Sequence, residues 1–126
     1  MAPGRHTSLI AVALLTAVPV RAATDAVSAF DDFSVKSAII AKCHPSESPA
    51  DRAYLAKGDA FKRAAAATLK AKLDASDPAH KSENAKKAED ELAHRLEARA
   101  YDIDEQIRNY GCPWLDGQLY AAGQNQ

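Results

Sequence analysis

Two cysteines, Cys43 and Cys112, and the residues around the second one carry the side chains best suited to chemistry. The segment 109–117, with the sequence NYGCPWLDG, also contains the only tryptophan, Trp114. The cysteines lack the Cys-x-x-Cys spacing of redox enzymes, and Cys43-His44 lacks the second cysteine that covalent haem attachment requires. We therefore predict that Cys43 and Cys112 form one disulfide with a structural role.

The other acidic residues and histidines give little support for a metal site or for catalysis. Glu91 and His94 have the spacing of a di-iron ligand pair, but such a site needs a second pair, and all four side chains must point inward. With Leu92 on the apolar face of a helix, Glu91 and His94 are rotated from it by about 100° and 200°, toward solvent. The chain also has no Gly-x-Ser-x-Gly elbow and no phosphate-binding loop. We predict no metal ligand, no cofactor and no enzymatic activity.

Two residues that carry or can acquire a positive charge have more than one interpretation. His44, next to the predicted disulfide, is either a surface histidine or a group whose charge changes between about pH 5 and 8 and alters a helix end. Arg99 falls inside the predicted apolar face of its helix, so its charge must be paired or must reach water. It either pairs with an acid on a neighbouring helix or lines an open groove where a partner's acidic group docks.

Aromatic residues gather near the predicted disulfide and form the best candidate for a recognition surface. Protein interfaces concentrate their binding energy on aromatic residues and on arginine. Aromatic residues also cap the open ends of helical bundles, so both interpretations are kept. The candidate partner-binding residues are Trp114, Tyr110, Tyr120 and Arg99, and Tyr54 belongs to the same aromatic set.

The N-terminus has the layout of a secretory signal peptide. A basic start precedes an apolar run from Leu9 to Val18, and small residues end at Ala22. An apolar core of about ten residues is shorter than the roughly 20 that span a bilayer, which disfavours the alternative of a membrane anchor. We predict a signal peptide over residues 1–22, a single helical domain over residues 23–126, and a periplasmic or secreted protein with no stable membrane span after cleavage.

The domain that follows the signal peptide is mildly acidic. Removal of Arg5 and Arg21 changes the formal net charge from −1 to −3. Proteins that bind nucleic acid usually carry a strongly basic patch, so we predict no nucleic-acid partner.

The composition predicts helices only, because alanine, lysine and glutamate dominate the middle of the chain and β-branched alternation is lacking. A first helix is expected over about 25–43. A second helix is expected to begin with Ser48 as N-cap and Pro49 at its first position, and to continue through Leu73. The alanines at 64–67 would let a neighbouring helix approach closely, and Gly58 adds a further notch. The alternative interpretation is that these alanines only favour helix formation.

The third expected helix has the strongest periodicity, with apolar residues every three or four positions. It is expected to start with Asp77 as N-cap and to end at Tyr110. Gly111 supplies the positive φ angle that often follows a last turn, and Pro113 is expected to prevent the helix from resuming.

Folding the second and third helices into an antiparallel hairpin about Asp77 brings Cys43 and Cys112 to the same end. We therefore predict an all-α fold: a small up-down-up helical bundle built on a long antiparallel helical hairpin, closed by one disulfide, with a short C-terminal extension. The hairpin is expected to reach about 40 to 50 Å, so the shorter first helix covers only part of it. The opposite tip of the hairpin is interpreted as a solvated surface. The alternative is that it binds an acidic partner or anionic lipid headgroups. Its lysines are Lys70, Lys72, Lys81, Lys86 and Lys87.

A small exported helical protein without catalytic motifs is expected to act by binding. The first hypothesis is an accessory, inhibitor, immunity or chaperone-like protein whose partner is an unidentified protein of the cell envelope. The alternative is a structural component of the envelope that assembles as a homodimer or larger homo-oligomer through coiled-coil packing of its long helices. A small enzyme is the third and weakest hypothesis.

Overall fold

The computed structural model describes residues 26–120, and the side chains of Leu119 and Tyr120 fall outside that description. Two predictions also lie outside the described residues, namely the signal peptide over residues 1–22 and the start of the first helix at Asp25. The described part of the chain is helical with short connections and contains no strand.

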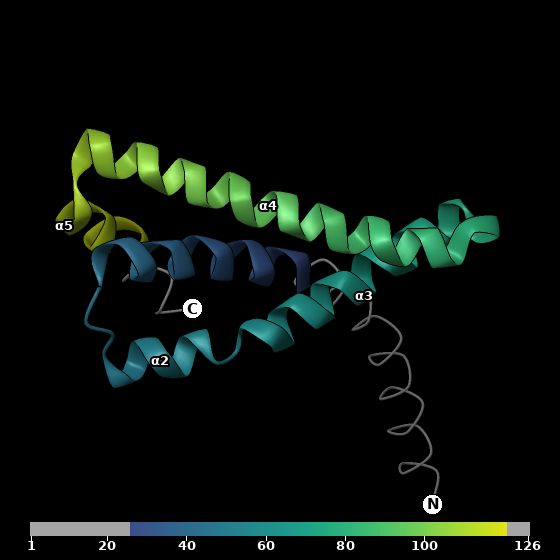
Figure 1. Ribbon diagram of the computed structural model, residues 1–126, viewed down its shortest axis with the longest axis horizontal. Coiled ribbons are helices and arrows are strands. Elements are labelled where there is room, and N and C mark those ends of the chain that lie inside the picture. Colours follow the sequence, from purple (N-terminus) through teal and green to yellow (C-terminus); the bar gives the residue numbers. More distant parts are fainter. Residues whose placement is uncertain (1–25, 121–126) are drawn as a thin grey trace, which may run out of the picture.

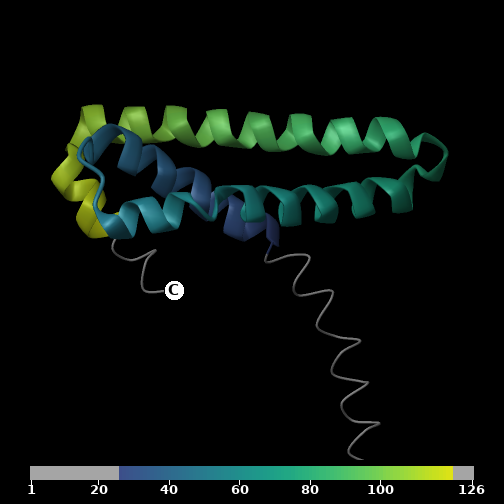
Figure 2. The same cartoon turned by 60° about the horizontal axis from the view of Figure 1, so that its bottom comes forward.

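The fold is the predicted up-down-up bundle. Two long helices, α3 (Gly58–Ser76) and α4 (Lys81–Tyr110), form an antiparallel hairpin, and the first helix (residues 26–43) packs beside it (Figure 1). Both views show that the first helix runs along the part of the hairpin next to α5 (Cys112–Leu115), whereas the turn between α3 and α4 projects beyond it (Figure 2). The first helix therefore covers only part of the hairpin, as its length predicts.

The predicted second helix is divided into two. Helix α2 (Pro49–Leu55) begins as expected, because the Ser48 hydroxyl accepts from the backbone N–H of Asp51 and the Asp51 carboxylate accepts from that of Ser48. It ends with a tightened turn at residues 56–57, and α3 starts afresh at Gly58. The prediction of one continuous helix was therefore wrong.

The break lies beside a close contact with the first helix. A Cβ atom at Gly58 would lie 2.7 Å from Cζ of Phe33, so only a glycine fits against this ring without displacing it. The same ring packs against Tyr54 and Phe61, with centroid separations of 5.5 and 5.4 Å. The predicted notch at Gly58 is confirmed, and the low helix propensity of glycine favours a break there over a continuous helix.

The start of the third helix also differs from its prediction. Asp77 makes no side-chain capping bond, and a 3-10 turn, η1 (Pro78–His80), precedes α4. The Asp77 carboxylate instead contacts Nδ1 of His80 at 2.9 Å. The side chain of Asn84 is fully buried and donates both to the Asp77 carbonyl oxygen and to Asp74. Asn84 therefore orders the turn, a role that the apolar periodicity gives no reason to expect.

The end of the third helix is where it was predicted, but the chain resumes helical structure at once. Gly111 has a φ of +84° and its N–H bonds to the carbonyl of Ile107. A short helix, α5 (Cys112–Leu115), follows with Pro113 in its first turn, where the missing N–H costs nothing, so the prediction for Pro113 was wrong. A π-helical segment, η2 (Asp116–Tyr120), continues from α5.

The core consists of two clusters that both include the first helix. Near the disulfide, Ile39 and Ile40 of the first helix pack with Ile103 of α4 and Leu115 of α5. Farther along the hairpin, a second cluster joins the first helix, α3 and α4 through Phe30, Ala65 and Leu92. Every residue named here is at most 3% exposed, so the first helix is an integral part of the core.

Two ion pairs tie the first helix to α4. Arg95 contacts Asp31 at 2.8 Å, and Lys42 contacts Asp104 at 2.7 Å. All four side chains are partly exposed, so each pair is expected to add at most about 1 kcal/mol to the free energy of unfolding. The main effect of the two pairs is to fix the register between the first helix and α4. Within residues 26–120, no helix is both long and apolar enough to cross a membrane.

Candidate functional site

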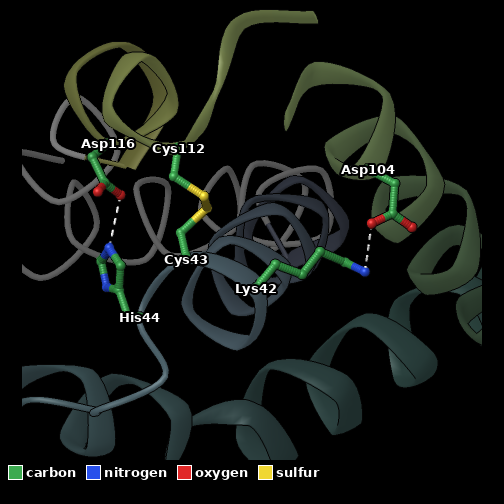
Figure 3. Close-up of a disulfide and its surroundings, with 6 residues drawn as sticks. All are labelled: Lys42, Cys43, His44, Asp104, Cys112 and Asp116. Atoms are coloured by element: carbon green, nitrogen blue, oxygen red, sulfur yellow. Dashed lines mark hydrogen bonds and ion pairs between the residues drawn. A yellow bond between two sulfur atoms is a disulfide. The ribbon is translucent and has the colours of Figure 1, made fainter. Parts of the chain in front are cut away.

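The site is the closed end of the bundle, which we define as Cys43, His44, Tyr110 and the segment 112–116. Cys43 is the last residue of the first helix, and Cys112 is the first residue of α5. The predicted disulfide joins them, with their Cα atoms 5.6 Å apart (Figure 3). The bond therefore attaches the end of the first helix directly to the segment that follows α4.

His44, the residue after Cys43, lies between two carboxylates. Its Nδ1 is 3.2 Å from Oδ2 of Asp51 in α2, and its Nε2 is 2.7 Å from Oδ1 of Asp116 in η2. Figure 3 shows that His44 reaches Asp116 on the same side on which Cys43 reaches Cys112. The consecutive residues Cys43 and His44 thus bind Cys112 and Asp116, which lie one helical turn apart.

The surroundings of His44 favour its protonated form. Burial by itself would lower the pKa of His44, but the hydrogen bonds and negative charges of Asp116 and Asp51 outweigh it and raise the pKa above 6.5. The protonated ring donates an N–H to each carboxylate. Asp51 is only 4% exposed and also caps α2, so His44 links three elements near the disulfide.

We expect His44 to make stability depend on pH. Because the pKa is higher in the folded than in the unfolded chain, the stabilisation is complete below 6.5 and is lost as pH rises through the folded pKa. Urea unfolding of the wild type is expected to show lower stability at about pH 8.5 than at about pH 6. His44→Gln is expected to cost about 1 to 2 kcal/mol at the lower pH and less at the higher one.

The matched control for this prediction is His94→Gln, because His94 is exposed and makes no hydrogen bond or ion pair in the described structure. The control is expected to keep the full pH dependence of the wild type. If His44→Gln keeps it as well, the bridge to Asp51 and Asp116 does not cause it.

Tyr110 and Trp114 form an exposed aromatic pair at the closed end. Tyr110 ends α4 and Trp114 lies in α5, and their rings are stacked with centroids 4.6 Å apart and planes inclined by 30°. Tyr110 is 59% and Trp114 40% exposed, whereas the next residue, Leu115, is fully buried. Trp114 also lies midway between Cys112 and Asp116, so α5 is fixed on both sides of the tryptophan.

The remaining aromatic candidates do not extend this surface within the described side chains. Tyr120 lies at the end of η2, and its side chain is outside the described part. Tyr54 packs against Phe33 and Phe61 with the Lys36 ammonium 5.2 Å from its ring centroid. Burial, followed by the charge of Asp32, raises the pKa of Tyr54 to about 12, as suits a phenol in a packed environment.

Arg99 is separate from the aromatic pair. It pairs with Asp102 of its own helix at 3.2 Å, so the hypothesis of an ion pair with a neighbouring helix was wrong. Its Nε is buried and has no hydrogen-bond partner among the described residues, while the side chain as a whole is 42% exposed. Arg99 precedes Tyr110 by eleven residues on α4, which corresponds to about 16 Å along the helix.

The groups that a metal ion would need are not assembled in the described structure. Within residues 26–120, no set of three or more His, Cys, Asp and Glu side chains is placed to hold a metal ion. The two ring nitrogens of His44 point at different carboxylates, Nδ1 at Asp51 and Nε2 at Asp116. The ring therefore lies between the two acids, and the three side chains do not converge on one point. Glu91 and His94 are both exposed on α4, as expected from their positions relative to Leu92.

Sequence reasoning identified the disulfide, Trp114 and Tyr110, and it missed the two acids that complete the site. Neither Asp51 nor Asp116 was selected as a site residue from the sequence. One signal could have indicated Asp116: it follows Cys112 by one helical turn, and His44 follows Cys43 directly. It becomes informative only when the disulfide is known to form.

Comparison with protein-family models, curated proteins and solved structures found no match to this chain.

Proposed function

We propose that this protein is exported and acts by binding another protein of the cell envelope through the closed end of its bundle. The observation that carries the proposal is the exposed, stacked pair of Tyr110 and Trp114 on a segment fixed by the disulfide and by the His44–Asp116 contact. The partner is held by the aromatic pair, and the protein belongs to the accessory, inhibitor, immunity or chaperone-like classes.

The energetics of interfaces support this surface as the binding site. A few aromatic anchors usually dominate binding energy, and tryptophan and tyrosine are the most frequent among them. A side chain that is already fixed before binding loses little conformational entropy when the complex forms. The backbone around Trp114 meets this condition. Cys112, before the tryptophan, is bonded to Cys43, and Asp116, after it, is hydrogen-bonded to His44.

Export is supported by two independent features. The first 22 residues have the pattern of a secretory signal peptide. The Cys43–Cys112 disulfide is of a kind that persists in oxidising compartments and is rare in the cytosol.

A structural homo-oligomer is the second candidate, favoured by one observation. Leu96 lies on the apolar face of α4, one turn from the fully buried Leu92, and yet it is 42% exposed. A second copy of the chain would cover it. Light scattering during size-exclusion chromatography separates the candidates, since a strict monomer at high concentration removes the homo-oligomer.

Replacing Trp114 by alanine is expected to reduce partner capture. A hot-spot residue contributes about 2 kcal/mol or more, so the affinity is expected to fall about thirtyfold. Immobilised mature protein, its Trp114→Ala variant and a Tyr101→Ala control are exposed to an envelope extract, and bound proteins are quantified by mass spectrometry. Tyr101 is also an exposed aromatic residue of α4, at 63%, but it lies away from the closed end.

The proposal expects one or a few proteins that the wild type and Tyr101→Ala retain and that Trp114→Ala loses. Circular dichroism of each variant confirms that the helical fold is intact. An unchanged set of captured proteins for Trp114→Ala would show that the aromatic pair is not the binding site.

A further inference from the structure

A pocket of about 400 Å³ lies between α3 and α4 in the half of the hairpin near its tip. This volume falls within the range of roughly 300 to 1,000 Å³ that is usual for small-molecule sites. Its apolar lining comes from both helices, and charged side chains stand around it. The lining includes Leu69, Leu73, Ala88, Lys72, Lys87 and Glu91.

The pocket continues the surface on which the first helix packs. Leu69 contributes to the cluster around Phe30 and Leu92, and it also lines the pocket. The first helix thus covers the hairpin up to the level of Leu69, and the pocket begins there. All of its lining residues belong to α3 and α4. Because the first helix does not reach this part of the hairpin, an apolar surface between the two helices is open to a ligand.

The two lysines of the pocket lack partners in the part of the chain that the structure describes. Neither Lys72 on α3 nor Lys87 on α4 makes an ion pair or a side-chain hydrogen bond, whereas other lysines nearby do. Glu91, one turn after Lys87, also lines the pocket, but it is engaged by Nε of Arg95 at 3.1 Å. The pocket therefore presents two uncompensated positive charges, one from each helix, beside an apolar lining.

We propose that this pocket binds a monomeric long-chain carboxylate, the anion of a free fatty acid. Its carboxylate lies between the ammonium groups of Lys72 and Lys87, and its alkyl chain covers Leu69, Leu73 and Ala88. Charge-assisted hydrogen bonds from two lysines suit a single carboxylate, and the apolar lining suits an unbranched chain. This site is distinct from the proposed protein-binding surface at the closed end.

The charge around the pocket favours a single anion over a membrane surface. The segment 70–91 contains five lysines and six acids, so it has no excess of positive charge. Lys70 and Lys86 are neutralised by Asp74 and Asp90, at 2.6 and 3.1 Å. An anionic bilayer would meet the whole tip, including these acids, whereas one carboxylate meets only the two lysines that lack partners.

Calorimetric titration of the mature protein with dodecanoate, below the concentration at which it forms micelles, tests the proposal. Saturable binding of one molecule per chain is expected. A chain longer by two carbons is expected to bind more tightly, by up to about fourfold for each methylene that is fully buried. Methyl resonances of Leu69, Leu73 and Ala88 are expected to shift, while Trp114 fluorescence, at the other end of the bundle, is expected to stay unchanged.

Charge variants locate the headgroup. The double variant Lys72→Gln/Lys87→Gln is expected to weaken dodecanoate binding about tenfold. The matched control, Lys57→Gln/Lys62→Gln, removes the same charge from exposed positions outside the pocket and is expected to bind like the wild type. Dodecyltrimethylammonium, with the same chain and a cationic head, is expected not to bind.

Three results would overturn the proposal. They are the absence of saturable binding, equal binding by the pocket double variant and its control, and binding of the cationic amphiphile as tight as that of dodecanoate. Association with vesicles of anionic phospholipid, without binding of monomeric dodecanoate, would also overturn it, because a membrane would then be the ligand. The protein-binding proposal is unaffected by any of these outcomes, since Trp114→Ala tests it separately.

Discussion

Replacing Cys43 and Cys112 together by serine is expected to lower the free energy of unfolding by about 4 kcal/mol. The bond joins residues 69 positions apart, and in the chain-entropy model a loop of this length restricts the unfolded chain by that amount. A domain of this size is usually stable by about 5 to 15 kcal/mol, so the variant is expected to lose a large share of its stability. Urea unfolding, followed by circular dichroism, measures the change.

Reduction of the wild type provides the control for this variant. Dithiothreitol is expected to move the midpoint of the wild type toward that of Cys43→Ser/Cys112→Ser and to leave the midpoint of the double variant unchanged. Equal midpoints for the oxidised wild type and the double variant would contradict a stabilising disulfide.

Leu92→Ala is expected to destabilise the protein by about 3 kcal/mol. Leu92 is fully buried in the cluster that joins the first helix, through Phe30, to the hairpin, through Ala65. Truncation of such a leucine removes its transfer free energy and leaves a cavity, which together cost about 2 to 5 kcal/mol. Thermal and urea unfolding measure the loss.

Leu96→Ala is the matched control, because it makes the same chemical change one turn farther along α4, where the side chain is 42% exposed. It is expected to cost less than about 1 kcal/mol, since little apolar surface is lost from the core. Equal costs for Leu92→Ala and Leu96→Ala would mean that the first helix does not bury Leu92.

Local patterns were sufficient to predict most of the fold. The apolar periodicity of α4 located Leu92 and Ile103 in the core, although Leu96 on the same face is exposed and buried Asn84 was missed. Ser48-Pro49 located the start of α2. The hairpin register about Asp77 then placed Cys43 and Cys112 at one end, where the structure has them bonded. These features depend on residues close together in the sequence or on simple helical geometry.

Features that depend on tertiary contacts were not predicted. A close approach at Gly58 was expected, but the division between α2 and α3 beside it was not, because the Phe33 ring that packs there comes from another helix. The turn at the tip depends on buried Asn84. The hydrogen bond from Lys70, followed by that from Asn84, holds the pKa of Asp74 below its usual value.

The candidate site also combines residues that the sequence indicates with contacts that only the folded chain reveals. Trp114 and Tyr110 could be selected from residue type and their nearness to Cys112. The bridge from His44 to Asp51 and Asp116 needed the folded chain, because the two acids are 65 positions apart in the sequence. Arg99 was expected to pair with an acid on a neighbouring helix, but its partner is on its own helix.

Site-specific photo-cross-linking in the producing cells tests the central claim most directly. A photoreactive amino acid at Asn109, which is exposed beside Tyr110 and leaves both stacked rings intact, is compared with one at Tyr101. We predict a covalent adduct with an envelope protein from position 109 that is absent from position 101 and is lost when Trp114→Ala is added. An adduct that persists in the Trp114→Ala background, or adducts from position 101 alone, would contradict binding through the closed end.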